Sequence, residues 1–168
     1  MRQRIVISGR GGQGVLTLTR ILAEAAAAAG DEVITSETHG MAQRGGAVLS
    51  MVKVGLFHGP LISPGEAEVG LFLHAPNLAV HGHYVRVGGA AFVNAKEPNG
   101  RLSVDASGLA SAAGAPVAAN LALLGYAVGK GGLFGEAALF EAVLQAVTPA
   151  SHLESNLAAF RAGVEAAR

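Results

Sequence analysis

A glycine-rich hexapeptide near the N-terminus constrains the fold of this chain more than any other feature of its sequence. Residues 9–14 (GRGGQG) directly follow the short apolar run 4–8, which is typical of a buried β-strand. Residues 15–29 then place apolar side chains at helical spacing, and Gly30 ends that helix. With a second strand pattern at 32–35, this order predicts a Rossmann-like βαβ unit that opens an α/β fold.

The remainder of the chain continues the same alternation of short apolar strands and helical patterns. Strands are expected at 47–54, 69–73, 90–94 and, more weakly, 102–104, and helices around 121–128, 136–147 and 153–167. Glycines and a proline at 55–60 predict a turn that pairs strand 47–54 with residues 61–62 in a hairpin. A length of 168 residues favours one domain, 1–168. We therefore expect a three-layer α/β domain with a mainly parallel, mixed sheet.

The composition excludes several classes of function. Lys plus Arg and Asp plus Glu balance at 12 each, which argues against binding of nucleic acid or anionic lipid. There is no cysteine, so this chain holds no disulfide, thiolate nucleophile or cysteine-ligated metal cluster. Charged residues make up only 14%, against about 25% in ordinary domains, which favours faces covered by other subunits.

One long uncharged stretch needs a test for membrane insertion. No charge occurs between Asp105 and Lys130, but Gly108, Gly114 and Pro116 interrupt the apolar pattern. This pattern predicts two buried helical segments and no membrane span. The N-terminus reaches glycine too early for a signal peptide, so a cytoplasmic protein is expected.

The glycines at 9–14 fit a pattern that is common at phosphate sites. Gly9, Gly11 and Gly14 match G-x-G-x-x-G, in which glycines bring backbone N–H groups close to an anion at a helix N-terminus. Glu37 lies where dinucleotide-binding folds place a ribose-binding carboxylate. Three readings stay open: a dinucleotide site, a site for another phosphate-bearing ligand, and close helix–strand packing without a ligand. A freestanding dinucleotide-binding oxidoreductase and a nucleotide-binding regulatory module are the corresponding functions.

A second motif follows the second predicted strand. Residues 36–46 (SETHGMAQRGG) are too polar and glycine-rich for a core element, so they predict a loop beside the first one at the carboxyl edge of the sheet. Arg44, flanked by Gly45 and Gly46, suits binding of a phosphate or carboxylate, and equally suits a subunit interface. His39 is a candidate proton-transfer group, although a loop hydrogen bond explains it as well.

Together these two motifs resemble a known family. The glycine pattern at 9–14 and E-x-H-G-M-A-Q-R-G-G at 37–46 are similar to the gamma domain of 2-oxoacid:ferredoxin oxidoreductases. The second motif is most similar to the beta subunit of the indolepyruvate branch, which corresponds to that domain. Residues 61–69, 120–125 and 156–163 also resemble segments of the family, so the resemblance extends along the whole chain.

The resemblance implies a small, non-catalytic subunit of a larger enzyme. Such enzymes oxidatively decarboxylate a 2-oxoacid on thiamine diphosphate, pass electrons through iron–sulfur clusters to ferredoxin, and form an acyl-coenzyme A. It implies that a larger partner subunit carries thiamine diphosphate and the clusters, and that coenzyme A is the ligand to test here. We find no Gly-Asp-Gly…Asn-Asn thiamine motif in this chain. The predicted ligand-binding or subunit-docking residues are Gly9, Gly11, Gly12, Gln13, Gly14, Glu37, His39, Gln43, Arg44, Gly45 and Gly46.

Two residues depart from the family pattern, and two histidines offer another chemistry. Arg10 adds a cation inside the glycine loop, and His74 follows a strand where the family often has an acidic residue. His81 and His83 would share one face of a strand, as a metal pair requires, but no third ligand is evident nearby. Solvent-exposed histidines are therefore the favoured reading. No G-x-S-x-G motif is present, which argues against a hydrolase.

Overall fold

A mixed six-stranded sheet forms the centre of the computed structural model, which describes residues 1–38, 46–99 and 102–168. The strands are β1 (Gln3–Arg10), β2 (Val33–Glu37), β3 (Ala47–Val54), β4 (Ala67–Phe72), β5 (Val85–Asn94) and β6 (Ser103–Val104), in the order β2-β3-β1-β4-β5-β6. The pairs β1–β4, β4–β5 and β5–β6 are parallel, whereas β3 runs antiparallel to both β1 and β2. The expected α/β fold with a mainly parallel, mixed sheet is confirmed.

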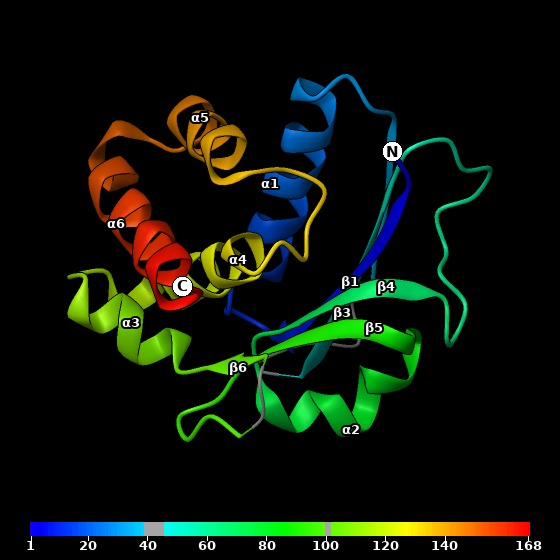
Figure 1. The fold of residues 1–168 in the computed structure, drawn as a ribbon, viewed down its shortest axis with the longest axis horizontal. Helices are drawn as coiled ribbons and strands as arrows, with labels where there is room; N and C mark the ends of the chain where they lie inside the picture. The colour runs from blue at the N-terminus through cyan, green and yellow to red at the C-terminus, as the bar shows by residue number, and fades with distance from the viewer. Residues whose placement is uncertain (39–45, 100–101) are drawn as a thin grey trace.

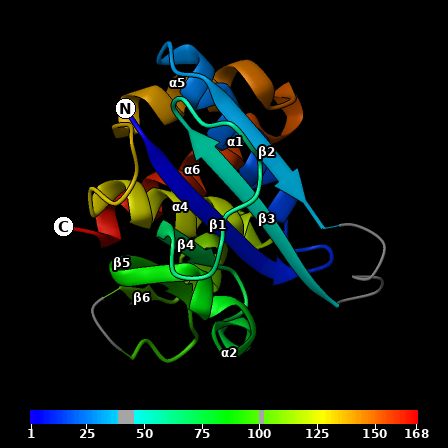
Figure 2. The same ribbon diagram turned by 90° about the vertical axis from the view of Figure 1, so that its right-hand side faces the viewer.

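Helices cover the two faces of this sheet unequally. They are α1 (Val15–Ala28), α2 (Leu78–His81), α3 (Ala106–Ala112), α4 (Ala119–Gly129), α5 (Ala137–Val147) and α6 (Ala150–Ala166), with the short 3-10 helices η1 (Ala75–Asn77), η2 (Gly82–Tyr84) and η3 (Pro116–Ala118). Figure 1 shows α1 and α3 to α6 on one face and α2 on the other. Figure 2 shows the chain between β3 and β4 crossing the face opposite α1.

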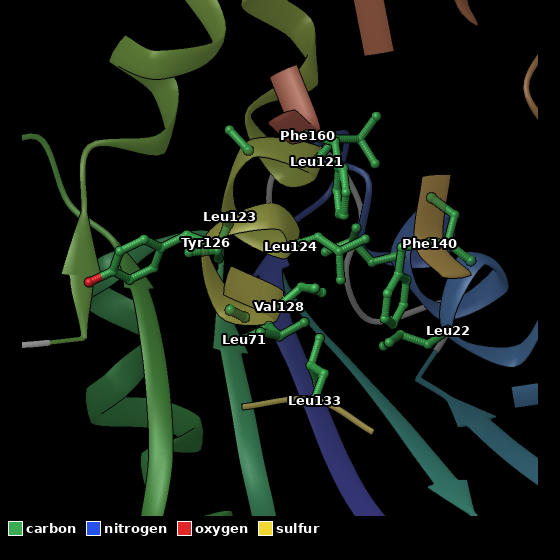
Figure 3. Packing of buried hydrophobic residues seen from close by; sticks show 14 of the residues in the cluster. Leu22, Leu71, Leu121, Leu123, Leu124, Tyr126, Val128, Leu133, Phe140 and Phe160 are labelled. Atoms are coloured by element: carbon green, nitrogen blue, oxygen red, sulfur yellow. The ribbon is translucent and has the colours of Figure 1, made fainter. Parts of the chain in front are cut away.

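The larger hydrophobic core lies between the sheet and the five-helix layer. Helix α4 is its centre: the nine residues 120–128 are all buried, so this helix contacts apolar neighbours on every side. Figure 3 shows Leu121 and Leu124 of α4 on the side of Phe160 of α6 and Phe140 of α5, with Leu123 and Tyr126 on the other side of the helix. The smaller core on the opposite face includes Val6, Leu49, Met51, Ile62 and Ala67.

Helices α4 and α6 approach each other closely because glycine occupies the contact on each helix. A Cβ atom at Gly125 would collide with the carbonyl oxygen of Phe160, and one at Gly163 would collide with the carbonyl oxygen of Ala122. Only glycine leaves room for two backbones at this separation. The glycine in the family-like segment 156–163 therefore has a structural role in helix packing.

The uncharged stretch before Lys130 divides as the sequence predicts. It forms α3, η3 and α4, with Gly114 at a φ of 79° and Pro116 beginning η3. Among the described residues, no helix is both long enough and apolar enough to span a bilayer. The bounds of helix α3 were not predicted. Its start is an Asp105 cap, whose Oδ1 accepts the N–H of Gly108 at 2.9 Å, and its seven residues are too few for a clear helical period.

Two local predictions were wrong. Residues 61–62 form no strand, and β3 pairs with β2 and β1 instead of with them. The side chain of Ile62 is buried in the smaller core, and its backbone N–H donates to the sulfur of Met51 at 3.2 Å, so this segment lies over the sheet and does not extend it. His81 and His83 also do not lie on a strand, because His81 ends α2 and His83 belongs to η2.

Candidate functional site

The glycine loop, residues 9–14, lies between the carboxyl end of β1 and the first turn of α1. Gly12 and Gly14 have φ angles of 89° and 86°, in the left-handed region where a side chain is strained. Gly14 is also the N-cap of α1, and no side chain caps that helix. Among the described residues, the N-cap position therefore offers the first-turn N–H groups of α1 no side-chain acceptor.

Three carboxamide side chains hold this loop in place. Gln13 accepts the N–H of Arg10 at 2.7 Å and donates to the carbonyl of Leu73 at 3.4 Å, which connects the ends of β1 and β4. Asn77 donates to the carbonyl of Gly9 at 3.0 Å. The third carboxamide, on α4, is Asn120, which donates to the carbonyl of Gly14 at 3.3 Å. The loop is thus fixed from three directions before any ligand or partner arrives.

The two sequence motifs meet at this edge of the sheet. Arg10 pairs with Ala47 in the β1–β3 ladder, and the N–H of Gly11 donates to the carbonyl of Gly46 at 3.2 Å. The predicted juxtaposition of the motifs therefore holds at Gly46. Four predicted site residues lie outside the described residues: His39, Gln43, Arg44 and Gly45.

The position of Glu37 separates it from the glycine loop. Glu37 lies at the end of β2 and pairs with Ser50 of β3. Because β3 lies between β2 and β1, two strand spacings, together roughly 10 Å, separate the lines of β2 and β1. In a dinucleotide-binding fold the corresponding strands are neighbours. This topology argues against Glu37 as a ribose ligand for a molecule bound at the loop.

A groove lies where the chain connections diverge at the carboxyl edge. From β1 the chain continues to α1 and the β2–β3 side, whereas from β4 it continues to α2 and β5 on the other side. Such a switch point is where open α/β sheets bind ligands. We call the hollows here the carboxyl-edge groove. Its main hollow, of about 450 Å³, is lined by Gln13, Leu73, His74, Asn94, Lys96, Asp105, Ser107, Gly108 and Ser111.

The groove continues past the glycine loop towards α6. A second hollow of about 340 Å³ is lined by Gly12, Gln13, Gly14, Thr17, Val117, Ala118, Asn120, Leu121, Pro149, His152 and Asn156. A third, of about 270 Å³, shares Gly12, Gln13, Val117 and Asn120 with the second and also shares Gln13 with the main hollow. The glycine loop therefore forms the middle of a long polar depression.

The walls of this groove are polar, with one apolar projection. The pKa of His74 lies below its ordinary value because of burial and the positive charge of Arg10. Lys96 and Asp105 provide one charge of each sign. Val117 is 93% exposed at the edge of the groove, where an apolar side chain is available to a partner. The surface can therefore bind a polar ligand and also pack against a partner protein.

Sequence reasoning missed two groove residues, Asn94 and Ser107, and one amide that supports the loop, Asn77, and it misjudged one histidine. These three residues come from different segments, and only the position of Asn94 at the end of a predicted strand hinted at a site residue. His81 is half-buried and lies 2.7 Å from the hydroxyl of Ser8, so it is not a solvent-exposed histidine. Among the described residues, no three His, Asp or Glu side chains gather closely enough to hold a metal ion.

Comparison with known proteins assigns this fold and site to a family. Residues 4–166 match the family described as pyruvate ferredoxin/flavodoxin oxidoreductase. The chain belongs to this family. It is a subunit of the gamma type in an oxidoreductase complex, so the family, the fold and the subunit role that the motifs predicted are confirmed.

Individual relatives agree with this assignment along nearly the whole chain. Indolepyruvate oxidoreductase subunit IorB of Pyrococcus horikoshii is 32% identical over 98% of this chain and 95% of its own length. The same-named subunit of Archaeoglobus fulgidus is 55% identical over 69 residues, which are 41% of this chain and 34% of that subunit. The 2-oxoglutarate synthase subunit KorC of Archaeoglobus fulgidus is 31% identical over 98% of this chain and 87% of its own length.

Solved structures share the fold. The gamma subunit of a keto/oxoacid ferredoxin oxidoreductase from Geobacter sulfurreducens superposes with a TM-score of 0.80 at 28% identity, covering 98% of both chains. A 2-oxoglutarate:ferredoxin oxidoreductase from Magnetococcus marinus gives a TM-score of 0.78 at 20% identity, covering 99% of this chain but 31% of that one. The same fold therefore occurs both as a separate chain and as one part of a longer polypeptide.

Proposed function

We propose that this chain is the small subunit of an indolepyruvate- or arylpyruvate-oxidising 2-oxoacid:ferredoxin oxidoreductase, with residues 1–168 forming one gamma-type domain. The observation that carries this proposal is the similarity to IorB over nearly the full length of both chains. The 55% identical stretch shared with a second IorB supports the indolepyruvate branch further. We place the complex in the cytoplasm.

The division of labour follows from the composition of the chain. Because it has no cysteine, it supplies no thiolate for an iron–sulfur cluster. We propose that a larger partner subunit carries the clusters and thiamine diphosphate, oxidises the 2-oxoacid and passes electrons to ferredoxin. This chain would then bind no cofactor when isolated, and coenzyme A would meet it only in the assembled enzyme.

The glycine loop and the carboxyl-edge groove are the proposed contact face for the larger subunit. The three carboxamides keep the loop rigid, which lowers the ordering entropy that association must overcome. Val117 offers an apolar anchor beside it. Polar groups of the groove, Lys96 among them, remain available to contact coenzyme A at the rim of the interface.

One observation favours a second candidate substrate, 2-oxoglutarate. KorC of a 2-oxoglutarate synthase is 31% identical over 98% of this chain, nearly as similar as IorB. The substrate of the complex therefore has to be measured. A dicarboxylate substrate would identify the 2-oxoglutarate branch without changing the role of this chain as a small subunit.

The decisive experiment is isolation of the tagged chain from its native cell without oxygen. We expect a larger iron–sulfur and thiamine-containing subunit to copurify, and the complex to reduce ferredoxin with indolepyruvate and coenzyme A. Pyruvate and 2-oxoglutarate should be poor substrates. Preferential oxidation of 2-oxoglutarate would instead assign the other branch.

The control for this experiment is the binding of a nicotinamide cofactor to the purified full chain. A dinucleotide at 100 times its dissociation constant stabilises a folded protein by about 2.7 kcal/mol, which is easily seen as a shift in melting temperature. We expect no such shift. A chain that is recovered without a partner and is stabilised by a nicotinamide cofactor would refute the subunit proposal.

A further inference from the structure

A buried polar cluster lies on the α2 side of the sheet and reaches the glycine loop from behind. Its members are Ser8 of β1, Asn77 of η1 and His81 of α2. Ser8 is 0% exposed, and its hydroxyl lies 2.7 Å from Nδ1 of His81. Asn77 donates to the same hydroxyl at 3.1 Å and to the carbonyl of Gly9 at 3.0 Å.

The donors and acceptors of this cluster define where its protons lie. The two N–H bonds of the Asn77 amide go to the Ser8 hydroxyl oxygen and to the Gly9 carbonyl. The hydroxyl hydrogen of Ser8 is then free to donate to Nδ1 of His81, and we assign the bond in this direction. In this assignment His81 is neutral, with its proton on Nε2. In this arrangement the Ser8 hydroxyl hydrogen and both amide hydrogens of Asn77 have acceptors.

Protonation of His81 reverses one of these hydrogen bonds. Nδ1 of a charged imidazole is a donor, so the Ser8 oxygen would face donors from both His81 and Asn77 while its own hydrogen lost its acceptor. A buried hydroxyl without an acceptor is destabilising, and the simplest relief is for Asn77 or α2 to shift. Either movement weakens the bond from Asn77 to Gly9.

We propose that His81 is a positioning residue through which pH controls the glycine loop. With His81 neutral, Ser8 and Asn77 hold the loop at Gly9; with His81 protonated, this support loosens. His81 lines none of the three described hollows of the groove, so it would act on the loop through Ser8 and Asn77. The inference goes beyond the proposed function, because it concerns the conformation of the loop and holds whichever ligand or partner the loop meets.

The surroundings of His81 lower its pKa, as this proposal requires. The pKa of His81 lies below its ordinary value because of burial and then because of the like charge of His83. Among the described residues, Tyr84 also lies beside it, with ring centroids 6.3 Å apart. Because its pKa is lowered in the intact cluster, His81 binds a proton more readily when the cluster is loosened. Support of the loop is therefore complete above the ordinary histidine pKa and declines as the pH falls below it.

Hydrogen exchange and NMR of the full chain test this proposal. We expect the ¹⁵N shifts of His81 to show the neutral Nε2–H tautomer at pH 7.5. The protection factors of the Arg10, Gly11 and Gln13 amides, corrected for intrinsic exchange, should fall several-fold between pH 7.5 and pH 5.5. In His81→Asn, whose carboxamide oxygen can still accept from Ser8 but cannot titrate, these protection factors should stay constant.

His83→Asn is the matched control, since it removes a neighbouring histidine but leaves the hydrogen bond to Ser8 intact. It should keep the pH dependence of the loop, with the midpoint displaced upwards because a like charge is gone. An Nδ1–H tautomer of His81 would overturn the proposal. So would a pH dependence of loop protection that is the same in His81→Asn as in the unaltered chain.

Discussion

At the scale of single residues, the site depends on amide side chains that form hydrogen bonds with the backbone. Gln13, Asn77 and Asn120 each bond to main-chain atoms of the glycine loop, so their side chains are largely occupied within the chain itself. Each connects the loop to a different element: the end of β4, the α2 side and α4. The loop can therefore present N–H groups without an ordering step when a partner or ligand binds.

Asn120 offers the clearest test of this role. It is 7% exposed, donates to Gly14 and accepts the N–H of Leu121 at 3.0 Å. Asn120→Ala should lower the free energy of unfolding by about 1–3 kcal/mol, because two partners lose a bond in a largely buried place. Urea unfolding of the full chain measures this loss.

The control is Asn156→Ala, on α6 at the far wall of the same groove. Its side chain makes no hydrogen bond with any described residue, so the change in unfolding free energy should stay within about 0.5 kcal/mol. Equal losses for the two variants would show that Asn120 contributes packing alone.

At the scale of elements, the contact between α4 and α6 organises the helix layer. The two helices meet through Gly125 and Gly163, and α4 has almost no exposed face. Helix α4 also carries Asn120, so the position of α4 against α6 determines where Asn120 contacts the glycine loop. The packing of the helices and the geometry of the site are therefore coupled through one element.

Gly163→Ala tests this contact. The added methyl group would collide with the carbonyl oxygen of Ala122, so the helices must separate, at a cost of about 1–3 kcal/mol in unfolding free energy. Thermal or urea unfolding gives the value. The loss should also appear as reduced protection of the amides in α4.

The same substitution at Gly82 is the matched control. There a Cβ would meet only the side chain of Leu78, at 3.7 Å, and φ is −59°, which alanine adopts freely. Gly82→Ala should be neutral or stabilise by about 0.4–1 kcal/mol through the unfolded state. A neutral effect at Gly163 would contradict the close packing described above.

At the scale of the whole molecule, the low charge content fits a protein whose surface is shared with other subunits. Only 14% of the residues are charged, and Val117 and Val87 are exposed at 93% and 103%. Val117 adjoins the glycine loop, whereas Val87 lies near the start of β5 at the other end of its strand. Substitution of each valine therefore compares the proposed contact face with an exposed apolar residue elsewhere on the surface.

Val117→Asp should reduce copurification of the larger subunit at least tenfold, because about 1.4 kcal/mol of lost affinity has that effect and a carboxylate in an apolar contact costs more. Val87→Asp should leave copurification unchanged. Circular dichroism of both variants checks that the fold is intact. Equal behaviour of the two variants would place the interface elsewhere.

The sequence by itself determined the order of the six strands and of helices α1, α4, α5 and α6, the βαβ opening, the glycine loop and the family, because periodicity, helix ends and the paired motifs are local in the chain. Only the tertiary structure decided that β3 inserts between β1 and β2, which moves Glu37 away from the loop. It alone brought Asn77 and Asn120 to the glycine loop, and His81 to Ser8 just before it. Strand order and the side-chain contacts between distant segments depend on residues far apart in the chain. Such contacts leave no periodic signal in a single sequence.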